Sequence, residues 1–476
     1  MINRLTKRSL KDRMSESIKE FCGIIGIYGH KEAAEMTYLS LYALQHRGQE
    51  GSGIVASDGK QVKHHIGRGL VNDVFDSSEI IEQLKGHIAI GHNRYSTTGS
   101  DADANVQPII AKMKDGTFAL GHNGNLVNSR EMRDLLQEEG ALFQTSTDSE
   151  VIVHLVARSK QKDLIDRIKE ALMQVRGAYS LVIMTENKLI AARDPEGVRP
   201  LALGKLDKGY MVASETCAMD LIGATYIRDV EPGEILIFDE KGMRSTRLIE
   251  KRESAHCIFE FIYFSRPDSQ IFGEYVDKTR RKFGKQLALE HPADADIVIS
   301  VPDSSNTAAV GYASRSKLKY ELALIRNHYI GRTFIQPRQE MRDFNVKVKF
   351  NPVGGILDGR RVVVVEDSIV RGTTLRLLTR MLRKAGAAEV HLRVSSPPIR
   401  FPCYYGMDFP TRDELIAANK SVEEIKKFMG VDSLGYLSLE GLLACVPSDK
   451  CGYCTACFSG EYPIPIDKDF KKNLYE

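Results

Sequence analysis

The sequence lacks a long apolar run. Its longest apolar stretches, such as Arg361–Val365 and its neighbours, are strand-sized and fall short of the roughly 18–20 residues that cross a membrane. The first 21 residues mix basic with acidic side chains and lack the apolar middle region of a secretory signal. These absences exclude an integral membrane protein and argue against export, so we expect a cytoplasmic protein.

An excess of charge of one sign is also lacking. The formal net charge is +3, from 66 Lys and Arg against 63 Asp and Glu. The basic excess that attracts nucleic acids or anionic membranes is therefore absent, and neither is expected as a partner. With 476 residues, 42% of them hydrophobic, the chain is too long for one ordinary core and predicts two or three domains.

The first part of the chain has the pattern of a mixed α/β domain. Short strand-like pieces recur in CGIIGIYGH, HIAIGHNRYST, FALGHNGNL, YSLVIMT, KLIAARDP and EILIFD. Helical spacing is found in Lys31–His46, Ser149–Ser159 and Asp166–Val175. The charged segment Asp239–His256 is short of large apolar groups and suits a connection between domains. We therefore predict domains at 22–256 and 257–476, preceded by a leader at 1–21.

The second part of the chain has a different pattern, in which apolar strands alternate with helices. IVISV (Ile297–Val301) leads to a PDSSN turn and a helix, and RVVVVEDSIVRGTT (Arg361–Thr374) leads to a helix over Leu375–Lys384 and then to EVHLRVSS. This alternation predicts a parallel sheet with ligands at the carboxyl ends of its strands.

Cys22 could supply both a nucleophile and a base if the leader is removed. Its own α-amine would then be free beside its thiol, and an α-amine with a pKa of about 7.7–8.0 is partly neutral near pH 7 and can act as a base. A buried structural cysteine is the alternative for the residue taken alone. The motifs that follow Cys22 argue against that alternative: CGIIGI, LQHRGQEGSG, GHNRYST, HNGNL and TSTDSE.

These five ordered motifs resemble the glutaminase domains of N-terminal-nucleophile (Ntn) glutamine amidotransferases. The resemblance implies that Cys22 attacks the side-chain amide of glutamine and releases ammonia. Asn123 and the N–H of Gly124 fit the need for donors to the oxyanion. Arg94 suits the carboxylate of glutamine and Asp148 its ammonium, and the Arg47–Gly48 turn is expected to line the pocket.

The second signature is VVVVEDSIVRGTT. A strand, two acids, a short loop and a helix start bring hydroxyl and N–H groups together where a phosphate is favoured. It is neither a P-loop nor a dinucleotide motif, because GxxxxGK[ST] and GxGxxG are absent. It resembles the phosphoribosyl pyrophosphate (PRPP) signature of type I phosphoribosyltransferases. The PRPP-binding residues implied here are Glu366, Asp367, Ser368, Arg371, Gly372, Thr373 and Thr374.

The carboxylates of Glu366 and Asp367 suit ribose hydroxyls and Mg²⁺, and the resemblance adds Ser304 to the metal site. The segment Gly331–Asn351 is similar to a loop that closes on substrate. Its basic residues Arg332, Arg338, Lys347 and Lys349 are expected to neutralise pyrophosphate. The family usually has Asp–Asp where this chain has Glu366–Asp367, so the charge is kept and the reach is longer.

Together the two halves resemble the amidophosphoribosyltransferase family over nearly all of Cys22–Pro463, including SRPDS (Ser265–Ser269) and SSPPI (Ser395–Ile399). The resemblance implies that ammonia from glutamine attacks the ribose of PRPP, giving 5-phosphoribosylamine. It also implies a homotetramer inhibited by purine nucleotides. A sensor protein that keeps only the PRPP fold is the main alternative, but it would not be expected to keep the motifs around Cys22, and no DNA-binding segment is recognisable.

The remaining cysteines suggest a metal. CGYCTAC (Cys451–Cys457) has three thiols at CxxCxxC spacing, which is typical of soft-metal ligation. The cluster-containing branch of the family implies a structural [4Fe–4S] cluster, with Cys451 in place of Cys457 as an open choice. Zinc and free buried thiols are the alternatives. The four implied ligands are Cys257, Cys403, Cys454 and Cys457.

Overall fold

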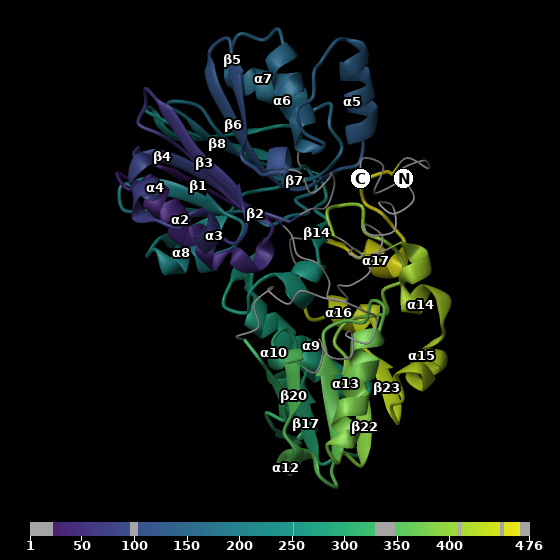
Figure 1. Ribbon diagram of the computed structural model, residues 1–476. Helices are drawn as coiled ribbons and strands as arrows, with labels where there is room; N and C mark the ends of the chain where they lie inside the picture. Colours follow the sequence, from purple (N-terminus) through teal and green to yellow (C-terminus); the bar gives the residue numbers. More distant parts are fainter. Residues whose placement is uncertain are drawn as a thin grey trace, which may run out of the picture.

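The structure, a computed structural model, describes residues 22–95, 103–250, 252–328, 348–407, 409, 411–447 and 452–466. We call residues 22–250 the N-terminal half and the described residues from 252 onward the C-terminal half. The two halves lie one above the other in Figure 1 and meet at a single junction.

Two antiparallel sheets form the N-terminal half. In spatial order the first contains β11 (Thr225–Asp229), β9 (Ala202–Leu206), β10 (Gly209–Ala213), β1 (Gly23–Tyr28), β4 (Ile88–Arg94), β2 (Gly51–Ser57) and β3 (Val62–Arg68). The second contains β13 (Gly242–Arg247), β12 (Glu234–Asp239), β8 (Leu189–Arg193), β7 (Gly177–Met184), β6 (Gly116–Leu126) and β5 (Ile109–Met113).

The sheets stack face to face, with helices outside both. Ile24 and Ile90 of the first sheet meet Val182 and Leu236 of the second in one core. The outer faces bury their apolar side chains under separate groups of helices. The helices are α2 (Ala33–Ala43), η2 (Gln45–Arg47), α3 (Val71–Val74), α4 (Ser78–Gln83), η3 (Asp103–Asn105), α5 (Ser129–Glu138), α6 (Ser149–Arg158), α7 (Leu164–Leu172) and α8 (Cys217–Leu221).

A five-stranded sheet organises the C-terminal half, and every neighbouring pair in it is parallel. Its spatial order is β18 (Lys319–Tyr320), β17 (Ile297–Ser300), β21 (Arg361–Glu366), β22 (Glu389–Val394) and β23 (Ser433–Tyr436). Its long helices are α9 (Val276–Glu290), α10 (Asn306–Ser316), α13 (Thr373–Lys384) and α15 (Val422–Met429). The predicted parallel sheet is confirmed.

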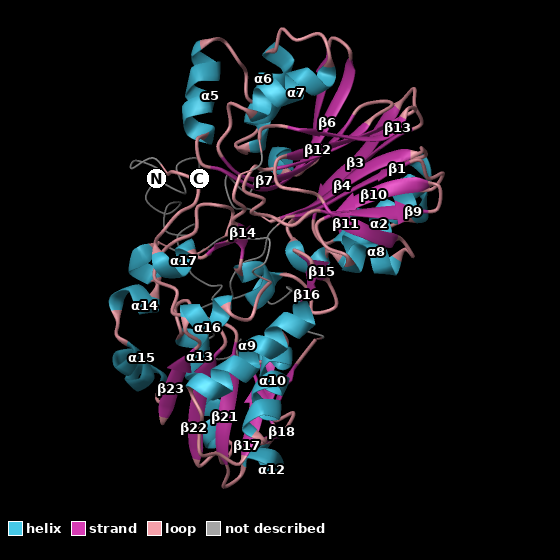
Figure 2. Cartoon of the chain, turned by 180° about the vertical axis from the view of Figure 1, so that it is seen from behind, coloured by secondary structure: helices cyan, strands magenta, loops and turns pink. Residues whose placement is uncertain are grey.

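The central strands of this sheet are apolar on both faces because both faces are covered. Val363 and Val365 pack toward α9 and α10, whereas Val362 and Val364 pack toward α13 and α15. Accordingly α13 lies in front of the sheet in Figure 1, and α9 and α10 lie in front of it in Figure 2, seen from behind.

Short elements complete the C-terminal half. They are β14 (His256–Cys257), the π-helix η4 (Glu260–Phe264), β15 (Gln270–Ile271), β16 (Glu274–Tyr275), β19 (Leu324–Arg326), β20 (Phe350–Pro352), α12 (Gly354–Leu357), η5 (Arg412–Glu414), α14 (Ile416–Asn419), α16 (Leu439–Leu443), β24 (Tyr453–Cys454) and α17 (Ala456–Ser459). β14 pairs in parallel with β24, so distant parts of the chain meet near the junction.

Two local features differ from the sequence expectations, a helix end and an edge strand. The helix expected over Lys31–His46 ends as α2 at Ala43, and the chain continues in the separate turn of η2. Within the segment expected to be a connection, β13 forms an edge strand on β12. Its largely exposed, charged side chains hide the apolar alternation that marks a strand.

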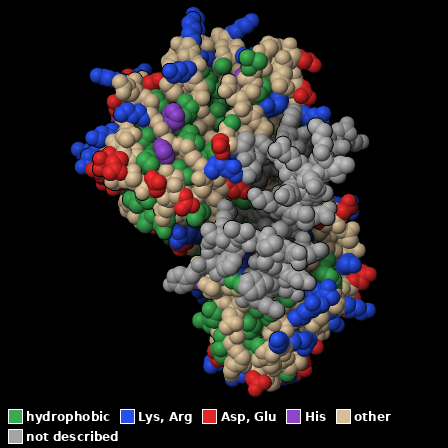
Figure 3. Space-filling view, viewed as in Figure 1, with side chains coloured by type: hydrophobic (Ala, Val, Ile, Leu, Met, Phe, Trp, Pro, Cys, Tyr) green, Lys and Arg blue, Asp and Glu red, His purple; other side chains and the backbone are tan. Residues whose placement is uncertain are grey.

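The surface carries charges of both signs, spread over the face seen in Figure 3. Within the described residues, every helix is too short or too polar to span a bilayer.

Candidate functional site

Cys22 lies immediately before β1 and is 8% exposed. Its thiol donates a hydrogen bond to the carbonyl oxygen of Tyr95, with a distance of 3.6 Å from sulfur to oxygen. Burial raises the pKa of the Cys22 thiol to about 11, and the charge of Arg94 opposes that rise. A thiol in these surroundings stays protonated near neutral pH, so it needs a base before it can act as a nucleophile.

The predicted partners Arg94 and Asp148 lie near this thiol. Arg94 ends β4, whose preceding residue Asn93 pairs with Gly23, the neighbour of Cys22. Asp148 stands immediately before α6. Both side chains are buried, and the charges of both act on the Cys22 thiol. The structure thus brings a thiol, a cation and an anion into one buried region, as a site for a free amino acid requires.

Asp148 is held by groups on both sides of it. Its Oδ2 accepts a 2.8 Å hydrogen bond from the N–H of Leu126, and its Oδ1 accepts one from the hydroxyl of Ser149. Nδ1 of His122 lies 3.7 Å from Oδ1 of Asp148. Burial alone would raise the pKa of Asp148, but His122 and these hydrogen bonds together hold that pKa below its usual value. Asp148 is therefore an anion at neutral pH.

Asn123 and Gly124 lie in β6, across the sandwich from β1. A Cβ placed on Gly121, two residues earlier, would be 3.8 Å from a methyl carbon of Ile24. Both polar atoms of the Asn123 side chain are buried and have no hydrogen-bond partner in the described part of the chain. An orphaned buried amide is costly in a folded protein and is typical of a site that binds a ligand.

Gly124 cannot be replaced without moving the backbone. Its φ is +151°, and a Cβ there would lie 2.0 Å from the carbonyl oxygen of Ala178. The residue following the orphaned amide therefore has to be glycine.

The Arg47 side chain is fully buried and paired with acidic residues, so its guanidinium does not line an open pocket. Its guanidinium is 1% exposed and forms ion pairs with Glu215 and Glu260. Gly48, the other residue of the predicted turn, packs tightly on the backbone of Arg94, where a Cβ would lie 2.7 Å from the carbonyl carbon. The turn thus supports the strand end that carries Arg94, while the Arg47 side chain points into an ion-pair network.

Three residues around Cys22 were not predicted from the sequence. His122 and Ser149 fix Asp148, with 2.9 Å between Nδ1 of His122 and Oγ of Ser149, and the charge of Glu50 acts on the Cys22 thiol. Each lies inside or beside a quoted motif, so adjacency in the sequence was the available signal. Adjacency does not reveal which neighbours point inward.

The acidic pair ends β21, as predicted. The hydroxyl of Ser304, in the loop after β17, donates a 2.5 Å hydrogen bond to Oδ2 of Asp367, and the hydroxyl of Ser368 donates to Oδ1. β17 and β21 are parallel neighbours, so their carboxyl ends meet at one sheet edge. The three residues predicted for the metal and ribose site, Ser304, Glu366 and Asp367, therefore lie at the same edge.

Glu366 has one buried carboxyl oxygen that lacks a partner. Its Oε2 has no hydrogen-bond partner within the described residues. Burial and then the charge of Asp367 raise the pKa of Glu366 well above its usual value, and the charge of Lys349 opposes that rise. Burial likewise raises the pKa of Asp367. Two buried carboxyl groups side by side are stabilised by a cation, which fits the predicted Mg²⁺.

The predicted phosphate loop has the form that anion binding needs. Gly372 stands immediately before α13 with a φ of +77°, a left-handed conformation that favours glycine. Thr373 and Thr374 lie in the first turn of α13, and the amino-terminal end of a helix favours an anion. Arg371 donates a 3.1 Å hydrogen bond to Glu414. The predicted loop residues Arg332, Arg338 and Lys347 lie outside the described residues, whereas Lys349 lies within them.

The four predicted cluster cysteines come close together near the junction. Cys257 is opposite Cys454 in the β14–β24 pair. The charges of Cys257, Cys403 and Cys454 all act on the Cys457 thiol, and burial, the largest cause, raises the pKa of that thiol well above its usual value. Cys451 lies outside the described residues. Within them, no three His, Cys, Asp or Glu side chains converge tightly enough to hold a single metal ion.

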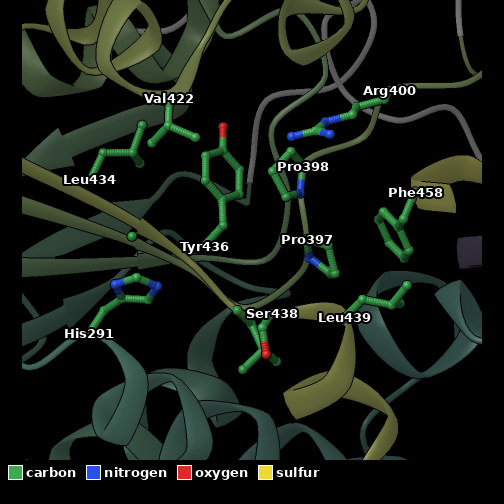
Figure 4. A pocket seen from close by; sticks show the side chains of 12 residues that line it. His291, Pro397, Pro398, Arg400, Val422, Leu434, Tyr436, Ser438, Leu439 and Phe458 are labelled. Carbon is green, nitrogen blue, oxygen red and sulfur yellow. The ribbon is translucent and has the colours of Figure 1, made fainter.

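A separate cavity of about 420 Å³ lies beside the edge strand β23. Figure 4 shows His291, Tyr436 and Arg400 among the side chains that line it. None of the predicted substrate or metal residues lines this cavity, so it marks neither the glutaminase nor the PRPP site.

Comparison with known proteins agrees with this two-part arrangement. The glutamine amidotransferase domain family matches residues 92–220, and the phosphoribosyl transferase domain family matches residues 277–396. The first match includes Arg94, Asn123 and Asp148, and the second includes Asp367. The predicted fold, an Ntn glutaminase domain followed by a phosphoribosyltransferase domain, is confirmed.

Relatives extend the likeness over nearly the whole chain. The amidophosphoribosyltransferase of Bacillus subtilis is 50% identical over 459 residues, covering 95% of this chain and 96% of the relative. Amidophosphoribosyltransferase 1 of Arabidopsis thaliana is 52% identical over 455 residues, covering 95% of this chain and 80% of the relative.

A solved structure gives the same result. It is the B. subtilis glutamine PRPP amidotransferase complexed with ADP and GMP, which matches with a TM-score of 0.90 and 50% identity, covering 94% of this chain and 99% of the other. The chain belongs to the amidophosphoribosyltransferase family, the pentosyltransferases that make 5-phosphoribosylamine from glutamine and PRPP in purine biosynthesis.

Proposed function

We propose that Cys22 is the nucleophile of the glutamine half-reaction and that its own α-amine, freed by removal of residues 1–21, is the base. The amine takes the thiol proton as the sulfur attacks the side-chain carbonyl carbon of glutamine. The protonated amine returns this proton to the amide nitrogen, ammonia leaves from the tetrahedral intermediate to give a thioester, and water then cleaves the thioester to give glutamate. The observation that carries this proposal is the buried Cys22 thiol, on which the charges of Arg94 and Asp148 both act.

The residues around the thiol then have distinct roles. Arg94 binds the carboxylate of glutamine, and Asp148 binds its ammonium, for which the lowered pKa of that carboxyl group provides a permanent negative charge. The orphaned amide of Asn123 and the N–H of Gly124 stabilise the oxyanion. Arg47 and Gly48 hold this pocket in shape rather than contact glutamine through the Arg47 guanidinium.

For the acceptor half-reaction, we propose that residues 371–374 bind the 5-phosphate of PRPP and that Glu366 and Asp367 bind its ribose. Ser304, Glu366 and Asp367 would hold Mg²⁺, which would neutralise the pyrophosphate leaving group. Support comes from the unpartnered Oε2 of Glu366, a buried group that a cation or a hydroxyl would satisfy. Lys349, together with Arg332, is proposed to contact pyrophosphate. Ammonia then attacks the anomeric carbon of the ribose, and pyrophosphate leaves.

We further propose domains at 22–256 and 257–476 and a [4Fe–4S] cluster on Cys257, Cys403, Cys454 and Cys457, as in the iron–sulfur branch of the family. The fit rests on four thiols from three segments of the chain, three of which act electrostatically on the Cys457 thiol or on one another, with the Arg199 cation acting near Cys257 and Cys403. A four-iron cluster is wider than a single zinc ion, so its thiols need not converge on one ion-sized point. The cluster would be structural and take no part in the reaction.

Regulation and assembly are proposed from the family resemblance. One solved relative is complexed with ADP and GMP, and we propose that purine nucleotides inhibit this enzyme by placing their phosphate on residues 371–374. A homotetramer and a cytoplasmic location are proposed on the same family basis.

The decisive experiment separates the two half-reactions. We expect Cys22→Ala to lose glutamine-dependent pyrophosphate release and to keep the reaction with ammonia as donor, because the transferase half is untouched. The matched control is Cys217→Ala, another buried cysteine of the N-terminal half, which should keep both reactions. Retained glutamine-dependent activity in Cys22→Ala would overturn the proposal.

A further inference from the structure

A buried ion-pair network crosses the junction between the two halves. The Arg47 guanidinium donates to Glu215 of its own half and to Oε2 of Glu260 of the C-terminal half, the latter at 2.5 Å. Arg199 donates to Oε1 of Glu260 at 3.2 Å. All four side chains are at most 1% exposed. Two cations and two anions thus balance one another without help from solvent.

The SRPDS segment (Ser265–Ser269) is fastened to this network. The Ser265 hydroxyl lies 2.8 Å from Oε2 of Glu260 and accepts from Arg47 at 3.1 Å. The N–H of Arg266 and the hydroxyl of Ser269 both donate to Oε2 of Glu215, at 2.8 and 2.6 Å. A motif that neither active site uses therefore connects a carboxylate of each half.

The same segment reaches the PRPP site through Arg280 on α9. The buried guanidinium of Arg280 donates to the carbonyl oxygens of Phe261 and Ser265, at 2.7 and 2.8 Å. These residues belong to or follow the π-helix η4, a form of helix that is common at functional sites. α9 in turn packs on Val365 of β21, two residues before Asp367.

At its other end the network reaches the glutamine site. A Cβ on Gly23, the neighbour of Cys22, would lie 3.5 Å from Cβ of Arg47. Gly48, which follows Arg47, packs on the backbone of Arg94. A small displacement of Arg47 would therefore move backbone that carries both the nucleophile and the residue proposed to bind the carboxylate of glutamine.

The requirement for such a connection is chemical. Ammonia released without an acceptor is lost to water or to protonation, so glutamine cleavage should respond to PRPP. Asp367, which is proposed to engage the cation and ribose of PRPP, directly follows β21, and α9 packs on that strand. Arg280 is fixed to the backbone of η4, whose first residue is Glu260. Because the charges in this network are buried, they are poorly screened and respond to small shifts in one another.

We propose that Glu260, Arg280 and the SRPDS segment form a polar coupling element through which occupation of the PRPP site activates the glutamine site. Glu260 and Arg280 are positioning residues in this element, since neither contacts a substrate. The inference rests on the proposed roles of Cys22 and Asp367, and it adds to them the route between the two sites.

The test compares glutamine hydrolysis with and without PRPP and Mg²⁺, measured as glutamate release. Glu260→Gln removes the negative charge that pairs with Arg47 and Arg199. We expect the stimulation of glutamine hydrolysis by PRPP to fall at least tenfold. The ammonia-dependent reaction should stay within about twofold of the parent. Glu260→Asp keeps the charge but shortens the reach, so it should fold readily and lose part of the stimulation.

Controls make the outcome specific. Arg280→Lys should reduce the stimulation, whereas the adjacent Arg281→Lys, an exposed side chain paired with Asp277, should not. The double variant Glu260→Gln/Arg280→Lys should be no worse than the more severe single variant, because both residues act in one route. Full stimulation in folded Glu260→Asp and Arg280→Lys would overturn the inference. If Cys22→Ala still cleaves glutamine, the proposed site itself is wrong, so the two failures are distinguishable.

Discussion

The hydroxyl of Ser304 donates a 2.5 Å hydrogen bond to Oδ2 of Asp367, which joins the loops that follow two neighbouring parallel strands. Hydrogen bonds to charged groups contribute roughly 1.5–3 kcal/mol, so we expect Ser304→Ala to raise the KM for PRPP about tenfold or more. The increase should be largest at limiting Mg²⁺. Ammonia-dependent kinetics at several Mg²⁺ concentrations measure it. Ser316→Ala, which removes a hydroxyl at the far end of α10, is the control, and an unchanged KM in Ser304→Ala would contradict the proposed site.

Asn123 should matter for the rate of glutamine cleavage rather than for glutamine binding. Removing one oxyanion donor costs roughly a hundredfold to a thousandfold in kcat, and we expect Asn123→Leu to lose about that much with little change in KM. The ammonia reaction should be unaffected. Asn128→Ala removes another buried asparagine amide, one that bonds to the carbonyl oxygen of Gln174, and should keep kcat. A loss confined to KM would assign Asn123 to binding instead.

The pH dependence of glutamine hydrolysis distinguishes the proposed base. Burial raises the pKa of the Cys22 thiol to about 11, so the thiolate is scarce at neutral pH. An α-amine with a pKa of about 7.7–8.0 loses its proton as pH rises through that range, and it acts as a base only when neutral. We therefore expect kcat/KM for glutamine to rise with pH and level off near pH 8. A profile that keeps rising toward pH 11 would contradict the amine as base.

The leader can be examined on the same samples. Intact-mass measurement of active enzyme should show that residues 1–21 are missing and that Cys22 is the first residue. Active protein that retains Met1–Phe21 would refute the proposed processing.

His92 should make the protein less stable in acid. Burial lowers the pKa of His92 to about 3, from about 6.5. Between these values the unfolded chain binds a proton that the folded chain does not, so stability present above pH 6.5 is lost as the pH falls. The loss reaches about 2 kcal/mol at pH 5. Urea unfolding measures the free energy of unfolding at pH 7.5 and at pH 5. Between these two pH values, His92→Gln should lose less of this free energy than the parent does, by that amount. The exposed His64→Gln on β3 is the control, and identical pH dependence in His92→Gln and the parent would refute the prediction.

The cysteine group can be tested without an activity assay. We expect purified protein to be brown and to contain about four iron atoms per chain, and Cys403→Ser to lose the iron and the stable fold. Cys445→Ser removes a buried thiol that is not among the four proposed ligands and should keep the colour. Colourless parent protein with stoichiometric zinc would contradict the cluster.

The fold and the separate sites were predictable because their signals are local. In the motif that begins with the apolar strand before Glu366, and in the glycine-rich motifs near Cys22, the candidate site residues lie within a few positions of one another. The structure places Arg94 and Asp148 near Cys22 and joins Ser304 to Asp367, in agreement with the arrangement that those motifs imply. The catalytic and binding roles themselves stay predictions.

Long-range partners could not be predicted from the sequence. Glu215 lies 168 residues after Arg47, and Glu260 lies 213 residues after it. The neighbouring residues in the sequence do not distinguish these buried acids from solvent-exposed ones. What identifies a buried carboxylate is the basic side chain that pairs with it in the folded structure. For the same reason, the motif around Arg47 predicts a place at the glutamine pocket but does not reveal the two acids that pair with its guanidinium.

The parallel pairing of Cys257 with Cys454 has a consequence for how the chain is made. During synthesis the sheets of the N-terminal half can close as soon as residue 247 has emerged, because all their strands lie before it. β14 must wait for β24, almost two hundred residues later. The ribosome therefore delivers one half ready to fold and the other with its first strand unpaired, and nascent chains are most exposed to aggregation and chaperone binding during that interval.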